Sequence, residues 1–270
     1  MKKINRAKNK KLWVVIIIFI CFYLYVSNNW IQNTRYNISS DKIDKSIRIV
    51  HLSDLHGKQF GKGNRRLIKN IMKEEPEIIV FTGDLIDAYR NTNIKESVQF
   101  LEQLSHFAPV YYIRGNHEYN TSRYQELMNY LNEVQGDLYI LDGGYQNIKL
   151  KGNNFSILGL DRSKKGVMDN FLSEKGYKII LNHYSENFSE NDNLSRLNVD
   201  LVLTGHAHGG QWRLPIVGGV YSPGQGFNPK YYQGINEDNG SIQVISRGLG
   251  NSIFPFRICN RPEVITIIIE

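Results

Sequence analysis

Residues 201–211 read LVLTGHAHGGQ, an apolar run that ends abruptly in two histidines and three glycines. A short apolar run bounded by a glycine-rich segment predicts a buried β-strand. His206 and His208 are alternate residues, which an extended segment directs to the same side. A His-x-His pair is by itself a weak indicator of a metal site, so its meaning depends on how the other strands end.

Four further predicted strands end in the same way. They cover residues 47–53, 77–82, 110–114 and 178–182. The polar side chains at these ends are those of Asp54, His56, Asp84, Asn116, His117 and His183. In open α/β sheets, ligands bind beyond the carboxyl ends of the strands. Carboxylate, amide and imidazole donors without a thiolate suit Mn, Fe, Zn or a similar divalent ion, so the set favours a metal centre.

The rest of the chain gives the fold class. Helical patterns at 64–75, 94–106 and 124–134 alternate with the first strands. Strand-like runs at 155–160, 241–246 and 263–269 follow, with little helix between them. This alternation predicts an α/β fold whose second half is richer in sheet. With no internal repeat and no second linker, we expect one domain over 47–270.

The ordered motifs Asp-x-His, Gly-Asp, Gly-Asn-His-Glu, a lone His and Gly-His-x-His resemble those of the calcineurin-like metallophosphoesterases. The resemblance covers about residues 48–270. It is closer to the membrane-anchored bacterial branch, on the residues 205–211 (GHAHGGQ), 214–215 (LP), 246–250 (SRGLG) and 261–263 (RPE). The sequence departs after His183, where Tyr184 and Ser185 replace the Glu-Pro or similar pair that is common there.

The resemblance implies a four-layer sandwich of two mixed β-sheets flanked by helices, and two divalent metal ions (manganese, iron or zinc). It assigns one ion to Asp54, His56, Asp84 and His208. It assigns the other ion to Asp84, Asn116, His183 and His206, so that Asp84 bridges the pair. Two negative charges would face about four positive ones, and the centre would attract a phosphate anion.

The implied activity is that of a metal-dependent phosphoester hydrolase in which a metal-bridging hydroxide attacks phosphorus. We expect a phosphodiesterase rather than a monoesterase. His117 follows a ligand without being one, and is the candidate catalytic residue that stabilises the transition state or protonates the leaving group. Its alternative is a structural imidazole near the metals. Gln211 and Arg247 are candidate substrate contacts in or near a glycine-rich segment, with structural packing as the alternative.

An apolar segment near the N-terminus predicts a membrane anchor. Residues 12–26 read LWVVIIIFICFYLYV and span about 22 Å as a helix, or about 30 Å when extended to residue 31. A cleaved signal peptide would need small residues before the cut, and a core helix would not explain the six bases in residues 1–11. We expect a basic cytoplasmic flank over 1–11, a transmembrane helix over 12–31 and a polar tether over 32–46.

The charge of the chain supports this topology. The net charge is +7, but residues 1–11 carry six of the 33 bases, which leaves 27 bases against 26 acids in the rest. A nearly neutral domain argues against a nucleic-acid partner. The excess of bases before the apolar segment predicts a single-pass protein of the cell membrane with an extracytoplasmic catalytic domain. The two cysteines are too few for a disulfide framework.

Several alternatives remain at this point. The substrate is expected to be a cell-envelope phosphodiester or a lipid-linked phosphate. A UDP-2,3-diacylglucosamine-type pyrophosphate hydrolase is the alternative, although that lipid would be met on the cytoplasmic side. A metal-free scaffold would show broken ligands, and the set is complete. A metallo-β-lactamase-like hydrolase would need His-x-His-x-Asp-His, whereas Gly-Gly-Gln follows His208.

Overall fold

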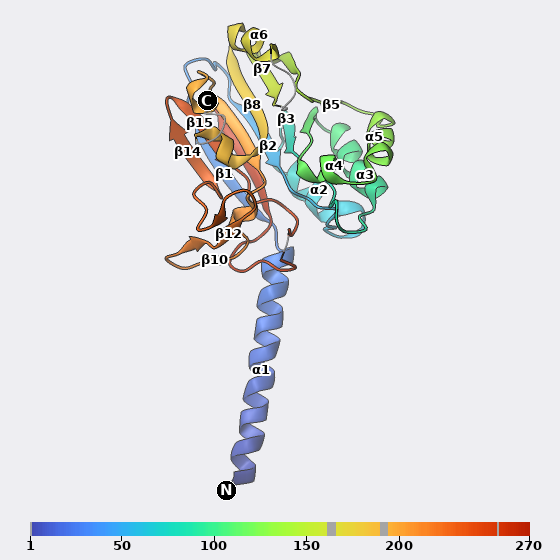
Figure 1. Cartoon of the computed structure of the whole chain (residues 1–270), viewed down its shortest axis with the longest axis vertical. Helices are drawn as coiled ribbons and strands as arrows, with labels where there is room; N and C mark the ends of the chain where they lie inside the picture. Colours follow the sequence, from blue (N-terminus) through green and yellow to red (C-terminus); the bar gives the residue numbers. More distant parts are fainter. Residues whose placement is uncertain (1, 161–165, 190–193, 253) are drawn as a thin grey trace.

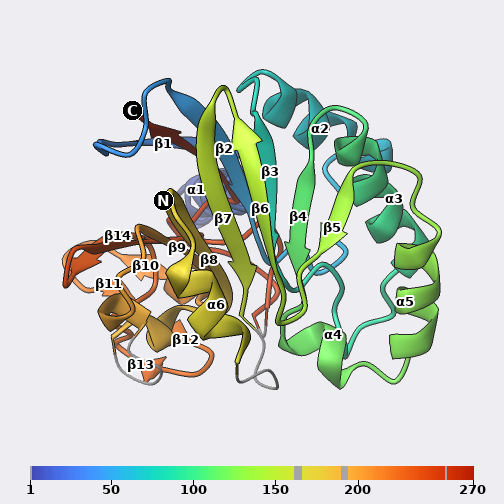
Figure 2. The same ribbon diagram turned by 90° about the horizontal axis from the view of Figure 1, so that it is seen from above.

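Two six-stranded mixed sheets form the centre of the fold (Figures 1 and 2). The computed structural model describes residues 2–160, 166–189, 194–252 and 254–270, with side chains from Lys10 onward. Sheet A has the order β1-β16-β2-β3-β4-β5 and sheet B the order β14-β15-β9-β8-β7-β6. The strands of sheet A are β1 Gln32–Ile38, β2 Ile47–Leu52, β3 Ile78–Thr82, β4 Val110–Ile113, β5 Leu138–Ile140 and β16 Glu263–Ile269. Those of sheet B are β6 Tyr145–Leu150, β7 Asn153–Gly159, β8 Tyr177–Tyr184, β9 Leu201–Gly205, β14 Gly234–Asp238 and β15 Ser241–Ile245.

Helices cover the outer faces of the two sheets, as Figure 2 shows. Sheet A carries α2 Arg65–Met72, α3 Ile94–Ser105, α4 Asn116–Asn120 and α5 Tyr124–Asn132, and sheet B carries α6 Val167–Ser173. Short 3-10 turns are η1 Lys62–Asn64, η2 Ser185–Phe188, η3 Leu194–Arg196 and η4 His208–Gly210. Two small hairpins pair β10 Arg213–Leu214 with β11 Gly218–Gly219, and β12 Tyr221–Ser222 with β13 Gly226–Phe227. The predicted four-layer α/β sandwich is confirmed.

Three apolar clusters separate these layers. One fills the space between sheet A and its helices, and includes Phe81, Leu101 and Leu104. A second lies between the two sheets and includes Ile49 and Ile179. A third lies under α6 and the 3-10 turns of sheet B. The central strands are buried on both faces, which is why they read as continuous apolar runs rather than as alternating patterns.

The segment expected as a polar tether differs from its prediction. Gln32–Ile38 forms the edge strand β1, which pairs with β16 in parallel over all seven residues. Its even-numbered side chains are more buried than the exposed Asn33, Arg35 and Asn37. Polar residues on the solvent side of an edge strand conceal the period-2 pattern of a half-buried strand. The folded domain therefore begins near residue 32 rather than at residue 47.

Helix α1 (Lys2–Asn29) projects from the domain (Figure 1). Among the described residues, Lys10–Asn29 is the helical stretch long and apolar enough to cross a membrane, and 6% of that window is buried. The predicted basic flank lies at the free end of this helix. The side chains of residues 1–9 lie outside the described part of the chain.

Strand directions place the functional end of the sheets beside α1. β1 leaves the end of α1 and runs away from it, and β16 is parallel to β1. β2 is antiparallel to β16, and β3 and β4 are parallel to β2. The carboxyl ends of β2, β3 and β4 therefore point back toward the end of the domain from which α1 projects.

Candidate metal centre

The polar strand ends of both sheets meet in one cluster. Asp54, His56, Asp84 and His208 are all buried, and one ligand atom from each lies within 4.8 Å of the others. Asp84, His183 and His206 form a second buried group by the same measure. Asn116 joins the second group, because its Oδ1 lies 3.1 Å from Nε2 of His183. The structure thus brings together all seven side chains that the sequence analysis predicted as metal ligands.

Asp84 is common to both groups. Its Oδ2 lies 3.6 Å from Nε2 of His56 and 3.3 Å from Nε2 of His183. His56 Nε2 lies 3.1 Å from Nε2 of His208, and His183 Nε2 lies 3.2 Å from Nδ1 of His206. One carboxylate between two pairs of imidazoles is an arrangement that suits a pair of neighbouring cations.

The backbone is strained where these side chains leave their strands. Asp54, His56, Asp84, His206 and His208 all have positive φ, between 49° and 67°. Residues other than glycine rarely adopt this conformation, and each instance costs on the order of 1–3 kcal/mol. Five such residues within one cluster indicate that the fold sacrifices stability to aim these side chains at a common point.

Glycines let the loops approach one another closely. A Cβ at Gly115 would lie 2.3 Å from Oδ1 of Asp84, and one at Gly205 would lie 2.6 Å from Oδ2 of Asp54. Any side chain at either position would collide with a candidate ligand. These glycines therefore serve the packing of the centre rather than loop flexibility.

Two buried carboxylates tie the loops together. Glu118 accepts hydrogen bonds from the backbone N–H groups of Asp84 and Gly115 at 2.8 and 2.7 Å, and from that of Ile86 at 3.2 Å. Burial first, and then the charge of Asp84, raise the pKa of Glu118 to about 7. The carboxylate of Asp54 accepts the N–H of His206 at 3.1 Å, which links the end of β2 to the end of β9 across the two sheets.

The imidazoles of the cluster differ in their protonation. Burial lowers the pKa of His56 to about 4 and that of His206 to about 3, so both rings are neutral and hold a lone pair at neutral pH. His183 donates from Nδ1 to the Thr82 carbonyl at 2.7 Å, which directs Nε2 toward Asp84. Burial opposes a proton on His183, but Asp84 outweighs it and raises the pKa to about 10. Burial raises the pKa of Asp54 to about 6.

These donors fit two divalent cations. Two pairs of imidazole nitrogens lie 3.1 and 3.2 Å apart, Nε2 of His56 with Nε2 of His208 and Nδ1 of His206 with Nε2 of His183. Together with carboxylate and amide oxygens they form the mixed nitrogen and oxygen donor set that Mn, Fe or Zn accepts. Among the described residues, Nδ1 of His56 and Nδ1 of His208 are buried without a hydrogen-bond partner.

His117 lies at the edge of this cluster. Its Nε2 is 4.0 Å from Oδ2 of Asp84, and its ring packs edge-on against that of His56 at 4.5 Å. Nδ1 accepts the Ala88 N–H at 2.9 Å, which leaves the proton of the neutral ring on Nε2. Burial opposes a second proton, but Asp87 and Asp84 favour it and raise the pKa of His117. In either state Nε2 carries a proton toward the centre.

Asp87 was missed by the sequence analysis. Its Oδ1 lies 3.6 Å from Nδ1 of His117, and it groups with His56 and His117 as a third possible set of ligands. Although burial opposes ionisation, the nearby His117 ring and a hydrogen bond from the Tyr89 N–H lower the pKa of Asp87 to about 2. The spacing Gly83-Asp84-x-x-Asp87 was the available signal, since it sets a second acid three residues beyond the shared carboxylate.

The two candidate substrate contacts are buried close to the centre. Gln211 is 2% exposed, directly after η4, with positive φ. Arg247 is 4% exposed and donates from Nη2 to Oε1 of Glu263 at 2.7 Å, within a buried ion pair. The guanidinium of Arg247 is thus engaged by Glu263.

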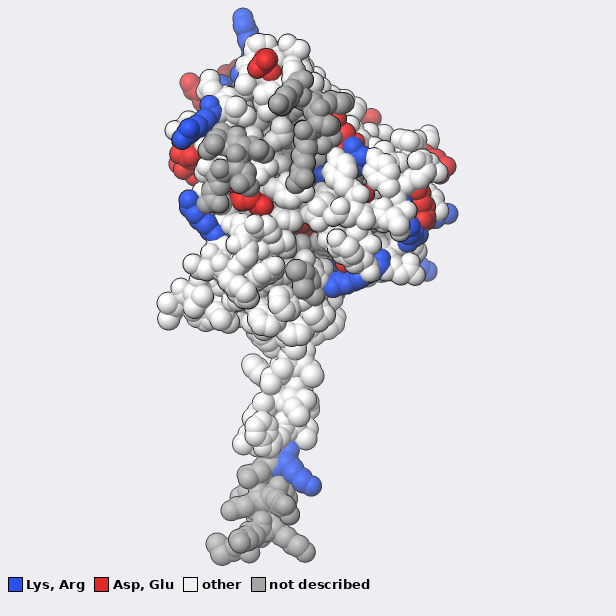
Figure 3. All heavy atoms as spheres, viewed as in Figure 1, with Lys and Arg blue, Asp and Glu red and all other residues white. Residues whose placement is uncertain are grey.

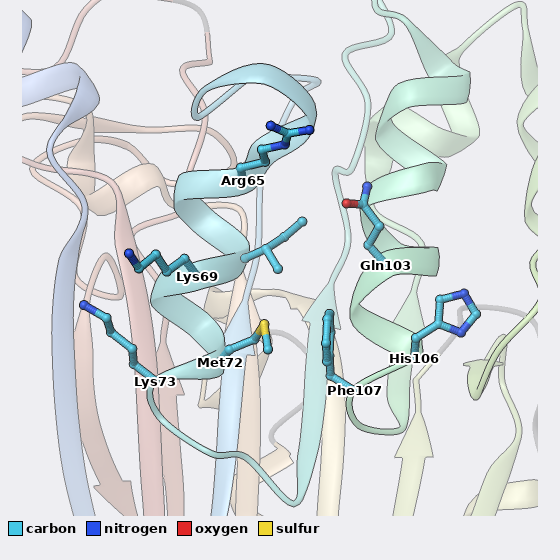
Figure 4. Close-up of a pocket in the computed structure, with 8 residues that line it drawn as sticks. Arg65, Lys69, Met72, Lys73, Gln103, His106 and Phe107 are labelled. Atoms are coloured by element: carbon cyan, nitrogen blue, oxygen red, sulfur yellow. The ribbon is translucent and has the colours of Figure 1, made fainter.

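The remaining two histidines, His51 and His106, lie outside the candidate groups of ligands. His51 is buried within sheet A and its Nε2 lies 2.9 Å from Oγ1 of Thr82. His106 lines a groove of about 450 Å³ between α2 and α3, with Met72 and Phe107 (Figure 4). This groove contains none of the candidate ligands.

Comparisons with known proteins agree with this geometry. The family model described as calcineurin-like phosphoesterase matches residues 47–210. The metallophosphoesterase YkuE of Bacillus subtilis (strain 168) is 29% identical over 255 residues, which cover 89% of this chain and 86% of the relative. The phosphodiesterase YaeI of Escherichia coli (strain K12) is 24% identical over 247 residues, which cover 89% of this chain and 88% of the relative.

A solved structure supports the fold. The NAD nucleotidase NadN of Haemophilus influenzae superposes with a TM-score of 0.51 at 16% identity, over 76% of this chain and 45% of that protein. At this identity the likeness concerns the fold alone. The two-sheet sandwich of this chain is therefore a fold that solved structures already contain.

Proposed function

The chain belongs to the calcineurin-like phosphoesterase family, and from this membership we propose that it is a membrane-anchored, two-metal phosphodiesterase. Hydrolysis of a phosphoester with the aid of metal is the activity of the family. The number of metals, the preference for diesters and the anchoring are our proposals.

The position of Asp84 supports a two-metal centre. Its carboxylate lies between His56 and His183, which belong to two different groups of donors. We assign one ion to Asp54, His56, Asp84 and His208, and the other to Asp84, Asn116, His183 and His206. When bound, a pair of Mn, Fe or Zn ions would supply positive charge to the phosphoryl oxygens and acidify water.

His117 is the proposed proton donor. Its Nε2 points toward the centre, while the Ala88 N–H and Asp87 hold the opposite side of the ring. A hydrogen bond from Nε2 to a phosphoryl or leaving oxygen would stabilise the charge that develops there. Replacement of His117 by Gln should lower turnover about 100-fold and leave the metal content unchanged. Loss of metal from this variant would make His117 a ligand instead.

A diester in or near the cell membrane is the proposed substrate class. A relative with 24% identity is named a phosphodiesterase, which supports the diester. The apolar helix Lys10–Asn29 supports an anchor, and an anchor confines the enzyme to substrates near a bilayer. Gln211 and Arg247 remain candidate contacts; the ion pair of Arg247 with Glu263 favours an indirect role.

The proposed topology has a cytoplasmic N-terminus and an extracytoplasmic domain. The six bases in residues 1–11 support it through the positive-inside rule. Fusions of a periplasm-type phosphatase and of a cytoplasmic fluorescent reporter after Glu270 test the orientation. Activity of the phosphatase fusion is expected, and fluorescence without phosphatase activity would reverse the topology.

A substrate screen tests the activity. The full chain is stripped of metal, reloaded with Mn, Fe or Zn, and offered a bis-ester, a monoester and a lipid-linked pyrophosphate. We expect metal-dependent turnover that is highest on the bis-ester. A preference for the pyrophosphate would support the nucleotide-lipid alternative, and turnover without metal would contradict the proposed mechanism.

A further inference from the structure

The metal centre is connected to the end of α1 by a short chain of contacts. The Asn28 side chain accepts the backbone N–H of Arg257 at 3.0 Å. Arg257 is fully buried, and its Nε donates to the Gly250 carbonyl at 3.0 Å. The Gly250 N–H in turn donates to the carbonyl of Asp54, a candidate metal ligand, at 2.6 Å. The end of the helix and the centre therefore lie on the same side of the domain.

The domain forms hydrogen bonds with the C-terminal part of α1 at several points. Lys58, two residues after the candidate ligand His56, donates to the Asn28 carbonyl, and Arg66 donates to that of Asn29 at 3.4 Å. Cations at a helix C-terminus interact favourably with its dipole. Closer to the middle of the helix, the Tyr23 hydroxyl accepts the Cys259 N–H at 2.8 Å. The helix direction is thus fixed relative to the domain.

The contact at Tyr23 sets the depth of the domain. From Leu12 to Tyr23 the helix rises about 17 Å, whereas a hydrocarbon core is about 30 Å thick. About 13 Å of the core would then lie alongside the lowest part of the domain. Interfacial elements reach about 5–10 Å into a bilayer, and local thinning accommodates a small remainder. The surface next to α1 must accordingly tolerate lipid.

That surface is apolar. The Arg213 N–H donates to the Ile258 carbonyl at 2.9 Å, which places β10 beside the residue that contacts Tyr23. Leu214, at the end of β10, is 44% exposed, and the turn that follows exposes Ile216 by 107% and Val217 by 59%. Trp30, directly after α1, is 63% exposed. We call these four residues the apolar collar. Figure 1 shows β10 on the side from which α1 projects, and Figure 3 shows few charged side chains there.

The charges around the collar match a lipid surface. Residues 201–236 contain no Asp or Glu, while Arg213 and Lys230 supply positive charge. Anionic headgroups attract such bases, and acids would be repelled. Within this stretch, residues 214–217 expose four consecutive apolar side chains without an acid among residues 212–236, which a water-facing loop has no need to do.

We propose that the apolar collar inserts into the bilayer that α1 spans, so that the metal centre faces the headgroups of the same leaflet. This inference rests on the proposed function and narrows its substrate to a phosphoester carried by a membrane lipid. The enzyme then hydrolyses its substrate without lifting it into water. A soluble bis-ester reaches the same centre from solution and does not need the collar.

Lipid quenching tests the contact independently of activity. The full chain with Cys21→Ser and Cys259→Ser carries a polarity-sensitive fluorophore at Ile216→Cys, or at Phe107→Cys as the control, which is 56% exposed beside the α2–α3 groove. It is placed in nanodiscs of phosphatidylcholine and phosphatidylglycerol with a quencher on the acyl chains. Quenching at 216 but not at 107 is expected. The proposal is overturned if both probes are equally exposed to water. It is also overturned if the probe at 216 is buried in a way that depends on protein concentration but is not quenched, since that would indicate contact between protein copies.

A kinetic comparison separates this proposal from the proposed function. The double variant Ile216→Asp and Val217→Asp should hydrolyse a phospholipid in the same nanodisc about tenfold more slowly than Phe107→Asp, because the collar no longer inserts. Both variants should retain turnover of a soluble bis-ester. Equal rates of the two variants on the lipid overturn the role of the collar. Failure of the unaltered chain to hydrolyse any phosphoester overturns the proposed function. In that case the quenching experiment still decides whether the collar contacts the bilayer.

Discussion

The two sheets deliver different chemistry to the same point. Sheet A supplies every oxygen donor of the candidate centre, from Asp54, Asp84 and Asn116 at the ends of β2, β3 and β4, together with His56. Sheet B supplies imidazoles alone, from His183, His206 and His208 at the ends of β8 and β9. The negative charge of the centre is therefore confined to one wall.

The ligands from sheet A and those from sheet B, which form the two walls of the centre, therefore have different roles. The carboxylates of sheet A neutralise the cations and set the charge left over for phosphate. The imidazoles of sheet B are neutral donors that define position and leave the charge unchanged. Loss of Asp84, which both groups share, should thus damage both groups of ligands, whereas loss of a histidine from sheet B should damage one.

Asp84→Asn should have the largest effect. The change removes the charge that both groups share, and turnover should fall on the order of 10³-fold or more, because several kcal/mol of transition-state stabilisation depend on the metals. Steady-state hydrolysis of a bis-ester measures it. Asp200→Asn is the matched control, since Asp200 lies just before β9, at the far end of that strand, and pairs with Lys42. Similar losses in both variants would mean that charge anywhere in the domain has this effect.

His206→Ala should have a smaller and one-sided effect. His206 belongs to the group around His183, so the group around His56 should retain its ion. We expect the metal affinity of one position to fall at least about 100-fold. Loss of a direct ligand should weaken binding more than loss of a residue that only hydrogen-bonds to a ligand, which costs about 10- to 100-fold. Metal titration of the stripped protein measures both positions. Simultaneous loss at both positions would abolish the proposed difference between the sheets.

Glu118→Gln should weaken the wall of sheet A alone. Glu118 accepts three backbone N–H groups that fix the loops of Asp84 and Gly115, and an amide cannot accept all three. Metal affinity should fall about tenfold without unfolding. Calorimetric metal titration with a thermal melt checks this, and unchanged affinity would show that these loops hold their shape without Glu118.

Proton release on metal uptake should give the smallest signal. The pKa of His183 is about 10, so this ring is protonated at pH 7 and must lose a proton to bind an ion, whereas His56, with a pKa of about 4, is already neutral. Asp54, with a pKa of about 6, adds a second proton as the pH falls below that value, so the affinity of its group should decline there. Calorimetry in buffers of different ionisation enthalpy should detect about one proton per chain at pH 7. If no protons are released at pH 7, the two groups of ligands do not differ in protonation as proposed.

Much of this fold could be predicted because the central strands are buried on both faces. Their apolar runs end abruptly at polar side chains such as Asp54 and His206, which marks the strand ends without knowledge of the pairing. Strand β1 was not predicted from the sequence because it is an edge strand whose partner, β16, lies about 230 residues later. A pairing so distant in sequence leaves no local pattern.

The candidate centre was predictable in its side chains but not in its supports. The ligands stand in recognisable spacings, whereas the roles of Asp87 and Glu118 depend on contacts between loops of different strands. The collar was missed because a turn with Pro215 and Gly218 has no periodicity, and its position near α1 depends on contacts of β10 and Cys259. Tertiary geometry, rather than local propensity, decides all three.

The metal content of the full chain and of Asp84→Asn tests the shared carboxylate most directly. Both proteins are purified, loaded with Mn, Fe or Zn, dialysed and measured by elemental mass spectrometry. The account predicts about two ions per chain in the unaltered protein and fewer than about one in the variant, because both groups lose the same ligand. Retention of two ions by Asp84→Asn would contradict it.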